Sequence, residues 1–90
     1  MTIEEFKKRI SQIKGVSEVE SYTLINNYGV AFTKNGYRFD IRYWANCYGA
    51  ALNYWQIMAN KEFYDAGKTL SHDTMYADDL SEFVPVVEGL

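Results

Sequence analysis

The sequence is poor in the residues that build disulfides, metal sites and membrane spans. It has one cysteine, one histidine and one proline in 90 residues. A single cysteine excludes an intramolecular disulfide and a zinc site of the cysteine-rich kind, and a lone thiol is typical of a reducing compartment. The N-terminus lacks the apolar stretch of a secretory signal, and the apolar segment Ala50–Ala59 is too short to span a bilayer. We therefore expect a cytoplasmic protein that makes no membrane contact.

Positive charge is scarce in the last third of the chain. Residues 61–90 hold two basic and seven acidic side chains, a net charge of −5, whereas residues 1–60 carry +2. A protein that binds nucleic acid through its phosphates needs a surplus of Lys and Arg on the binding face. The acidic third therefore disfavours nucleic acid as a partner and favours a basic protein.

Aromatic and β-branched residues are abundant, and they organise the expected fold around one hairpin. Asn35-Gly36 separates two runs rich in such residues, and a type I′ turn needs the positive φ that Asn tolerates and Gly adopts freely. The turn predicts the cross-strand pairs Lys34–Tyr37, Phe32–Phe39, Val30–Ile41 and Tyr28–Tyr43. The last three pairs form an apolar core face. The opposite face carries Arg38, Asp40, Arg42 and Trp44.

The segments before the hairpin predict a helix and a strand. Thr2–Lys14 has an apolar stripe at helical spacing, with Thr2 and Glu5 placed as a capping box and Gly15 after the helix. Val16–Ile25 predicts a first strand, joined to the hairpin through Asn26-Asn27. A shift of one residue in this turn exchanges the two faces of the strand, so the sequence does not decide which face is buried.

The segments after the hairpin predict two helices. Ala50–Ala66 has a helical series that ends at Gly67, although Ala51–Met58 also alternates as a fourth strand does. A last helix begins near Ser71 or Asp73, and Pro85 limits its extension. Its expected inward residues are Tyr76, Leu80 and Phe83. The apolar tail Val84–Leu90 either docks on the domain or meets a partner, and a homodimer is one such outcome.

The expected fold is therefore a single α+β domain over residues 1–90. It has an N-terminal helix, a three-stranded antiparallel β-meander and two C-terminal helices packed on the sheet.

No motif predicts an enzyme, a cofactor or a metal site. Gly67-Lys68-Thr69 matches the end of a phosphate-binding P-loop, but Glu62 stands where that motif needs a glycine. Cys47 and His72 could pair as a nucleophilic site only if the fold brought them together. The acidic residues near His72 have no ordered metal-ligand spacing, and a solvated acidic helix face explains them more simply.

The leading functional hypothesis is a small non-enzymatic protein–protein interaction module. An acidic helix would bind a basic, nucleic-acid-handling partner in place of phosphate. The residues predicted for this contact are Asp73, Asp78, Asp79, Glu82, Tyr76 and Tyr64. In size and acidity, though in no shared motif, the chain is similar to phage-borne anti-CRISPR and anti-restriction proteins, which implies an inhibitor.

Two alternatives remain open. The first is a nucleic-acid-binding sheet that uses Arg38, Arg42 and Trp44, with rings and guanidinium groups available for stacking on bases. The second is a small-molecule pocket between the sheet and the helices, lined by Trp55 and tyrosine rings.

Overall fold

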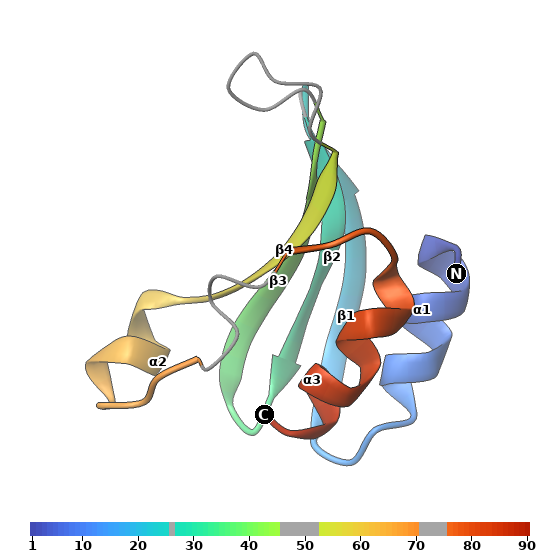
Figure 1. Cartoon of the computed structure of the whole chain (residues 1–90). Helices are drawn as coiled ribbons and strands as arrows, with labels where there is room; N and C mark the ends of the chain where they lie inside the picture. The colour runs from blue at the N-terminus through green and yellow to red at the C-terminus, as the bar shows by residue number, and fades with distance from the viewer. Residues whose placement is uncertain (26, 46–52, 71–75) are drawn as a thin grey trace.

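The computed structural model describes residues 1–25, 27–45, 53–70 and 76–90, with only the backbone described for Tyr76. Its described strands form one antiparallel sheet, and helices pack against that sheet (Figure 1). In order across the sheet, the strands are β1 (Val16–Thr23), β2 (Asn27–Lys34), β3 (Tyr37–Trp44), β4 (Tyr54–Ala59) and β5 (Tyr76–Ala77). The helices are α1 (Ile3–Ser11), α2 (Lys61–Asp65), the 3-10 helix η2 (Leu80–Phe83) and α3 (Val84–Glu88). The α+β class and the antiparallel sheet are confirmed, but a sheet limited to three strands is wrong.

The central hairpin forms with the predicted register. Lys34 pairs with Tyr37, and the three following pairs match those expected from the Asn35-Gly36 turn. Asn35 has φ of 53° and Gly36 has φ of 88°, so both adopt the left-handed conformation that the turn requires. Phe32, Val30 and Ile41 are fully buried, which confirms the predicted core face.

The N-terminal helix is confirmed but is shorter than predicted. The backbone N–H of Glu5 donates to the Thr2 hydroxyl at 3.1 Å, which caps the first turn. Phe6 and Ile10 are fully buried on the predicted stripe. The helix ends at Ser11, and a turn leads to Gly15, whose φ of 88° fits the left-handed conformation expected there.

The strand β1 has a bulge that decides which of its faces is buried. The register shifts between Ser17 and Glu20, and Glu18 there has φ of 51°. After the bulge, Tyr22 pairs with Gly29 and so lies on the face opposite the core. Leu24 lies beyond the strand, where its N–H donates to the Asn27 carbonyl at 2.7 Å.

The predicted helix over Ala50–Ala66 is wrong for most of its described residues. Tyr54–Ala59 is β4, and only Lys61–Asp65 is helical. The fourth strand, which was the competing interpretation, is the correct one. β4 forms hydrogen bonds with the edge of β3 that does not pair with β2. It also adds the buried side chains of Trp55 and Ile57 to the core face.

The predicted last helix is also wrong in its extent. Tyr76 belongs to β5, and the chain then enters η2 and α3 without one continuous helix. Leu80 and Phe83 are buried as expected. Pro85 does not end the helix, because it lies in the first turn of α3, where its missing N–H is not needed. The tail docks on the domain through buried Val86 and Val87.

The helices pack on one face of the sheet, and the core lies between them and that face (Figure 1). Helices α1 and α3 lie side by side along one face of the sheet (Figure 1). Their buried residues share one apolar core with the inward residues of β2, β3 and β4. Phe63 of α2 joins this core edge-to-face with Phe39, at a ring-centroid distance of 5.3 Å. None of the helices in the described ranges has the length and apolar character needed to cross a bilayer.

Candidate functional site

The face of the sheet opposite the core, here called the outer face, contains a tight arginine–tyrosine–carboxylate network. The Tyr22 hydroxyl donates to Asp40 Oδ1 at 2.6 Å, and Arg42 Nε donates to the Tyr22 hydroxyl at 2.9 Å. A terminal nitrogen of Arg42 lies 3.0 Å from Asp40 Oδ2. The Arg42 guanidinium also lies 5.7 Å from the ring centre of Tyr22 and 5.5 Å from that of Trp44. The network therefore fixes the guanidinium of Arg42 between two rings.

Arg38 belongs to a second set of contacts on the same face. It forms an ion pair with Glu20 at 2.5 Å, donates to the Glu18 carbonyl at 2.7 Å and contacts the Thr33 hydroxyl at 3.2 Å. The sequence-predicted trio of Arg38, Arg42 and Trp44 thus lies on one face, as expected. Each guanidinium already faces a carboxylate, however, so this face offers little uncompensated positive charge.

The small residues of β2 on the outer face have different surroundings. A Cβ at Gly29 would collide with the backbone carbonyl oxygen of Ile41 and would lie 2.8 Å from the Tyr22 hydroxyl, so the phenol covers this glycine closely. Next to it, Ala31 lines a shallow hollow of about 270 Å³ together with Arg38, Arg42 and Met58. The hollow is open to solvent, and its polar groups come from the two arginines, Asp40 and Asn60.

The network changes the acidity of Tyr22. Partial burial, followed by the hydrogen bond to Asp40, raises the pKa of the Tyr22 phenol to about 12. Ionisation would place a negative phenolate against the Asp40 carboxylate. Tyr22 is therefore a neutral hydrogen-bonding group at physiological pH, and its role is to position Asp40 and Arg42.

The acidic residues predicted to bind a partner do not lie on one helix. Asp78 and Asp79 precede η2, Asp78 is exposed, and Asp73 lies outside the described residues. Asp79 is the N-cap of η2, and Glu82 completes its capping box through the Asp79 backbone N–H at 3.2 Å. Two of the predicted contact residues therefore also stabilise the chain locally.

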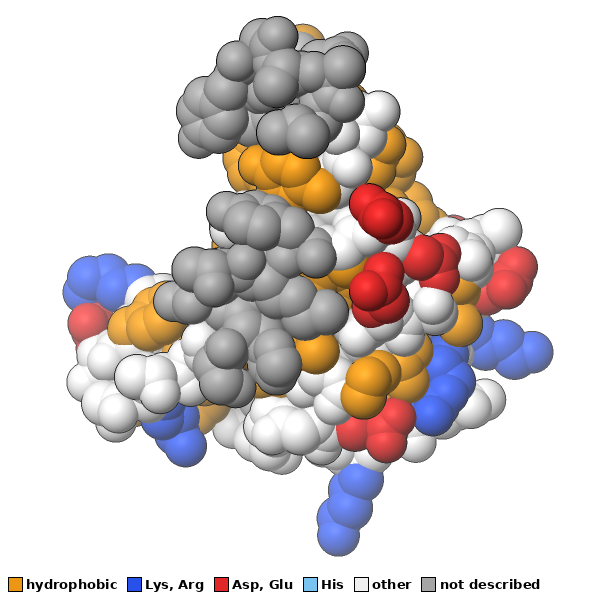
Figure 2. All heavy atoms as spheres, viewed as in Figure 1, with side chains coloured by type: hydrophobic (Ala, Val, Ile, Leu, Met, Phe, Trp, Pro, Cys, Tyr) orange, Lys and Arg blue, Asp and Glu red, His pale blue; other side chains and the backbone are white. Residues whose placement is uncertain are grey.

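Asp79 also binds the start of the chain. Its Oδ1 lies 3.0 Å from the ammonium group of Met1. Hydrogen bonds from the Ser81 hydroxyl, the Met1 ammonium and the Ser81 backbone lower the pKa of Asp79 to about 2. The first turn of α1, which contains Glu4 and Glu5, follows Met1 closely in the chain and so lies at the same end of the molecule as η2. Glu4 also pairs with Lys7 at 3.7 Å. Figure 2 shows acidic side chains gathered on this part of the surface.

The predicted tyrosines are separated from these acids or lie outside the description. Tyr64 is 42% exposed on α2, which Figure 1 shows on the other side of the molecule from the start of α1. The backbone of Tyr76, in β5, pairs with that of Gln56 in β4. A single contact surface that includes both Tyr64 and Asp78 is therefore not the arrangement found.

Three other aromatic rings form a cluster on the core side of the sheet. The rings of Tyr28, Tyr43 and Trp55 lie 5.0 to 5.6 Å apart between their centres. They pack against one another, and neither of the two hollows described here is lined by Trp55 or a tyrosine. Close to this cluster, Leu24 is 50% exposed and Ile25 is 99% exposed at the turn between β1 and β2.

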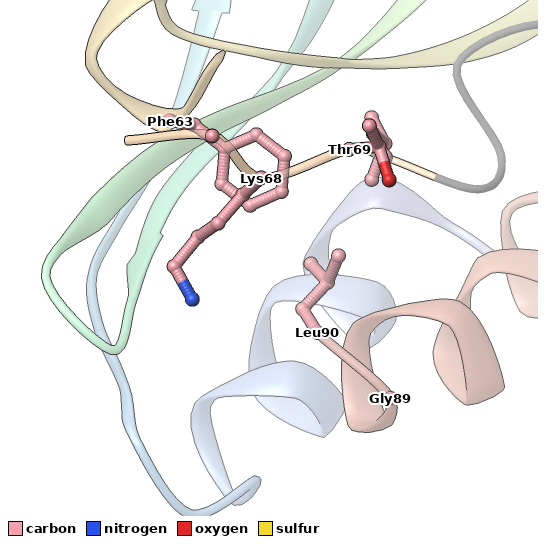
Figure 3. A pocket seen from close by; sticks show the side chains of 7 residues that line it. Phe63, Lys68, Thr69, Gly89 and Leu90 are labelled. Carbon is pink, nitrogen blue, oxygen red and sulfur yellow. The ribbon is translucent and has the colours of Figure 1, made fainter. Parts of the chain in front are cut away.

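A groove lies elsewhere, between the chain after α2 and the end of α3. It encloses about 380 Å³ and is lined by Phe63, Leu70 and Leu90, with Lys68 and Thr69 beside them. In Figure 3 the side chain of Leu90 points towards Thr69, whereas Lys68 extends in another direction. The ammonium group of Lys68 lies 5.5 Å from the ring centre of Tyr37. The groove is therefore lined by both polar and apolar groups.

The hypotheses based on Cys47 and His72 fall on residues outside the described ranges. Among the residues that the structure does describe, no group of three or more His, Cys, Asp or Glu side chains is placed to hold a metal ion.

Comparisons with known proteins gave no match: no family model, no curated protein and no solved structure is similar to this chain.

The hydrophobic residues at the β1–β2 turn were missed by the sequence reasoning. A signal for them was present, because residues 21–33 and 43–60 contain no charged side chain. The register pairs Asn27 with Trp44 and Trp44 with Tyr54, so the two uncharged segments meet at one end of the sheet.

Proposed function

We propose that this chain is a small non-enzymatic module that binds a basic protein partner. The observation that carries the proposal is an acidic end assembled from two distant parts of the sequence. Glu4 and Glu5 come from the first turn of α1, and Asp78, Asp79 and Glu82 come from the segment that leads into η2. The Met1–Asp79 ion pair joins the two parts.

Such a surface acts mainly on association rate and specificity. Clustered carboxylates attract a partner with a surplus of Lys and Arg and repel acidic competitors. A basic site that normally receives phosphate is one class of surface that would accept them. An inhibitor of a nucleic-acid-handling protein is therefore the specific form of the proposal.

The alternative of a nucleic-acid-binding sheet has weaker support. Its support is that Trp44, Arg38 and Arg42 lie on one face of the sheet, where an aromatic ring and basic groups are the features that bind single-stranded nucleic acid. However, Arg38 and Arg42 share the outer face with Glu18, Glu20 and Asp40, and these carboxylates form ion pairs with them. Phosphates would have to displace these carboxylates before they could bind.

The test is a pull-down from a nuclease-treated lysate with a tagged chain, followed by mass spectrometry of the retained proteins. The informative variant is the double substitution Glu5→Lys and Asp78→Lys. It reverses two exposed charges at the acidic end and leaves the capping contacts of Asp79 and Glu82 intact. We expect retention of a basic protein that weakens as salt rises and is lost in this variant.

The matched control is Glu62→Lys with Asp65→Lys. It makes the same change of net charge on α2, away from the acidic end. Equal loss in the control would mean that only the total charge matters. Equal retention by the wild type and the Glu5/Asp78 variant would refute the proposed acidic contact.

A further inference from the structure

One end of the sheet has no charged residue on the segments that build it. This end, here called the loop end, contains the β1–β2 turn with Leu24 and Ile25, the last residue of β3, Trp44, and the first residue of β4, Tyr54. The residues from 21 to 33 and from 43 to 60 include no Asp, Glu, Lys, Arg or His. All of the charges in the chain are carried by other segments.

The loop end projects from the rest of the fold. Figure 1 shows that the sheet extends past α1 and α3 at this end. Ile25 is 99% exposed and Leu24 is 50% exposed, although both are large aliphatic side chains. Adjacent exposed aliphatic residues beside Trp44 and Tyr54, on segments without charged residues, resemble the buried centre of a protein interface, where charged residues are depleted and aromatic residues are enriched. Arg42 borders these segments, with its guanidinium 5.5 Å from the ring centre of Trp44.

The loop end is continuous with the acidic end. Trp55 packs against Tyr28 and Tyr43, and it pairs across the sheet with Ala77. Asp78 follows Ala77 directly in the chain and is exposed. Asp78 therefore borders the loop end at the β5 edge of the sheet, next to the start of β4.

We infer that the loop end is the apolar centre of the partner interface and that the acidic end is its charged rim. The inference rests on the proposed function, because it concerns the same partner. The occupant that fits is a protein with an apolar cleft bordered by Lys or Arg. Leu24 and Ile25 would enter the cleft, while Asp78 and its neighbours would face the basic border.

The charge next to the loop end favours this occupant over two others. An anionic membrane surface would be repelled by the carboxylates beside Ala77 and by the net charge of −3. A second copy of the chain docked symmetrically through the loop end would bring two acidic rims towards each other. A basic protein meets neither obstacle.

The experiment replaces Ile25 with the photo-crosslinking residue benzoylphenylalanine in the full chain. We expect a crosslink from position 25 to the same basic protein that the wild type retains. The matched control places the same residue at Tyr64, which is also exposed but lies on α2. A crosslink of that protein from position 64 and not from position 25 would overturn the inference.

A second variant, Leu24→Ser with Ile25→Ser, measures the contribution of the two side chains. Both side chains are exposed, so we expect the thermal unfolding curve of the variant to match that of the wild type. Retention of the basic protein should fall roughly tenfold or more, because central apolar residues dominate interface energies. This loss should persist at every salt concentration, in contrast to the loss caused by Glu5→Lys with Asp78→Lys.

The outcomes separate the inference from the proposed function. Loss in the charge variant with full retention in the serine variant would overturn the inference and leave the acidic contact standing. Absence of any retained basic protein would overturn both. The wild type is also tested for binding to phosphatidylcholine vesicles and, by sedimentation, for dimerisation. If either is observed and the serine variant abolishes it, the loop end binds a membrane or a second copy, and the inference is overturned.

Discussion

The ammonium group of Lys34 donates a hydrogen bond to the backbone carbonyl of Val87 at 2.7 Å. A second hydrogen bond goes to the Glu88 carbonyl at 2.8 Å, so one side chain of the hairpin satisfies two carbonyls in the last turn of α3. Lys34 is only 5% exposed, and this burial lowers its pKa. A cation at the C-terminal end of a helix also interacts favourably with the helix dipole. Lys34 thus fastens the C-terminal segment to the sheet.

Replacing Lys34 with Met should destabilise the protein. The substitution keeps most of the packing of the side chain and removes the ammonium donor. The Glu88 carbonyl then loses its Lys34 partner, and the Val87 carbonyl keeps only its backbone hydrogen bonds at the helix end. We expect the free energy of unfolding to fall by about 1–3 kcal/mol, measured by urea denaturation. The control is Lys14→Met at an exposed site, where the change should stay within about 0.5 kcal/mol. Equal effects at the two positions would contradict the role of Lys34.

The Tyr22 network should make stability sensitive to alkaline pH. The pKa of Tyr22 is about 12 in the folded chain and 10.0 when unperturbed. In this range the unfolded chain loses the proton first. The contribution of Tyr22 to stability is therefore complete below pH 10.0 and is lost as the pH rises through about 12. Tyr22→Phe should flatten this part of the curve of unfolding free energy against pH.

The same variant should remove the most alkaline step of a tyrosinate absorbance titration. Tyr64→Phe, at an exposed tyrosine, serves as the control and should leave that step in place. Below pH 10, Tyr22→Phe should also cost about 1 kcal/mol, because Asp40 and Arg42 each lose a hydrogen bond. Persistence of the alkaline step in the Tyr22→Phe variant would assign it to another phenol, such as Tyr28, whose pKa is also raised by burial.

Asp79 should make stability sensitive to acid. Its pKa is about 2 in the folded chain against an ordinary value of 3.8. A lowered pKa gives stability that is complete above pH 3.8 and is lost as the pH falls through about 2. Asp79→Asn keeps a residue that can cap η2 but removes the charge that faces Met1. We expect a shallower loss of unfolding free energy between these pH values in the variant.

Asp78→Asn is the matched control for this measurement. Asp78 neighbours Asp79 in the chain but takes no part in the contacts with Met1 and Ser81. Its substitution should leave the acid limb of the stability curve close to that of the wild type. An identical acid limb in the Asp79→Asn variant would show that the ion pair with Met1 does not stabilise the fold.

Local sequence signals were sufficient where the structure depends on neighbouring residues. The Asn35-Gly36 turn fixed the register of β2 and β3, since only one pairing is compatible with a two-residue turn. Thr2 marked the start of α1 for a similar reason, because a cap acts within one helical turn. The trio of Arg38, Arg42 and Trp44 followed directly from alternation along β3.

Where a sequence pattern is compatible with two structures, tertiary contacts determine which one forms. Trp55 and Ile57 belong to β4 because the edge of β3 offers hydrogen bonds and a core face that their alternation fills. The bulge at Glu18 placed Tyr22 opposite Gly29, and no spacing in the sequence indicates this bulge. The acids of the last third were recognised from composition. Their position beside α1 depends on the contact between Asp79 and Met1.

The sequence by itself determined the hairpin, the first helix, the acidity of the last third and the absence of charge from two long segments. The tertiary structure alone decided that those segments meet at one end of the sheet, that Leu24 and Ile25 are exposed there, and that Lys34 holds the end of α3. The physical reason is the range of the interactions. Turns and caps are set within a few residues, whereas strand pairing and burial depend on residues that only the complete fold brings together.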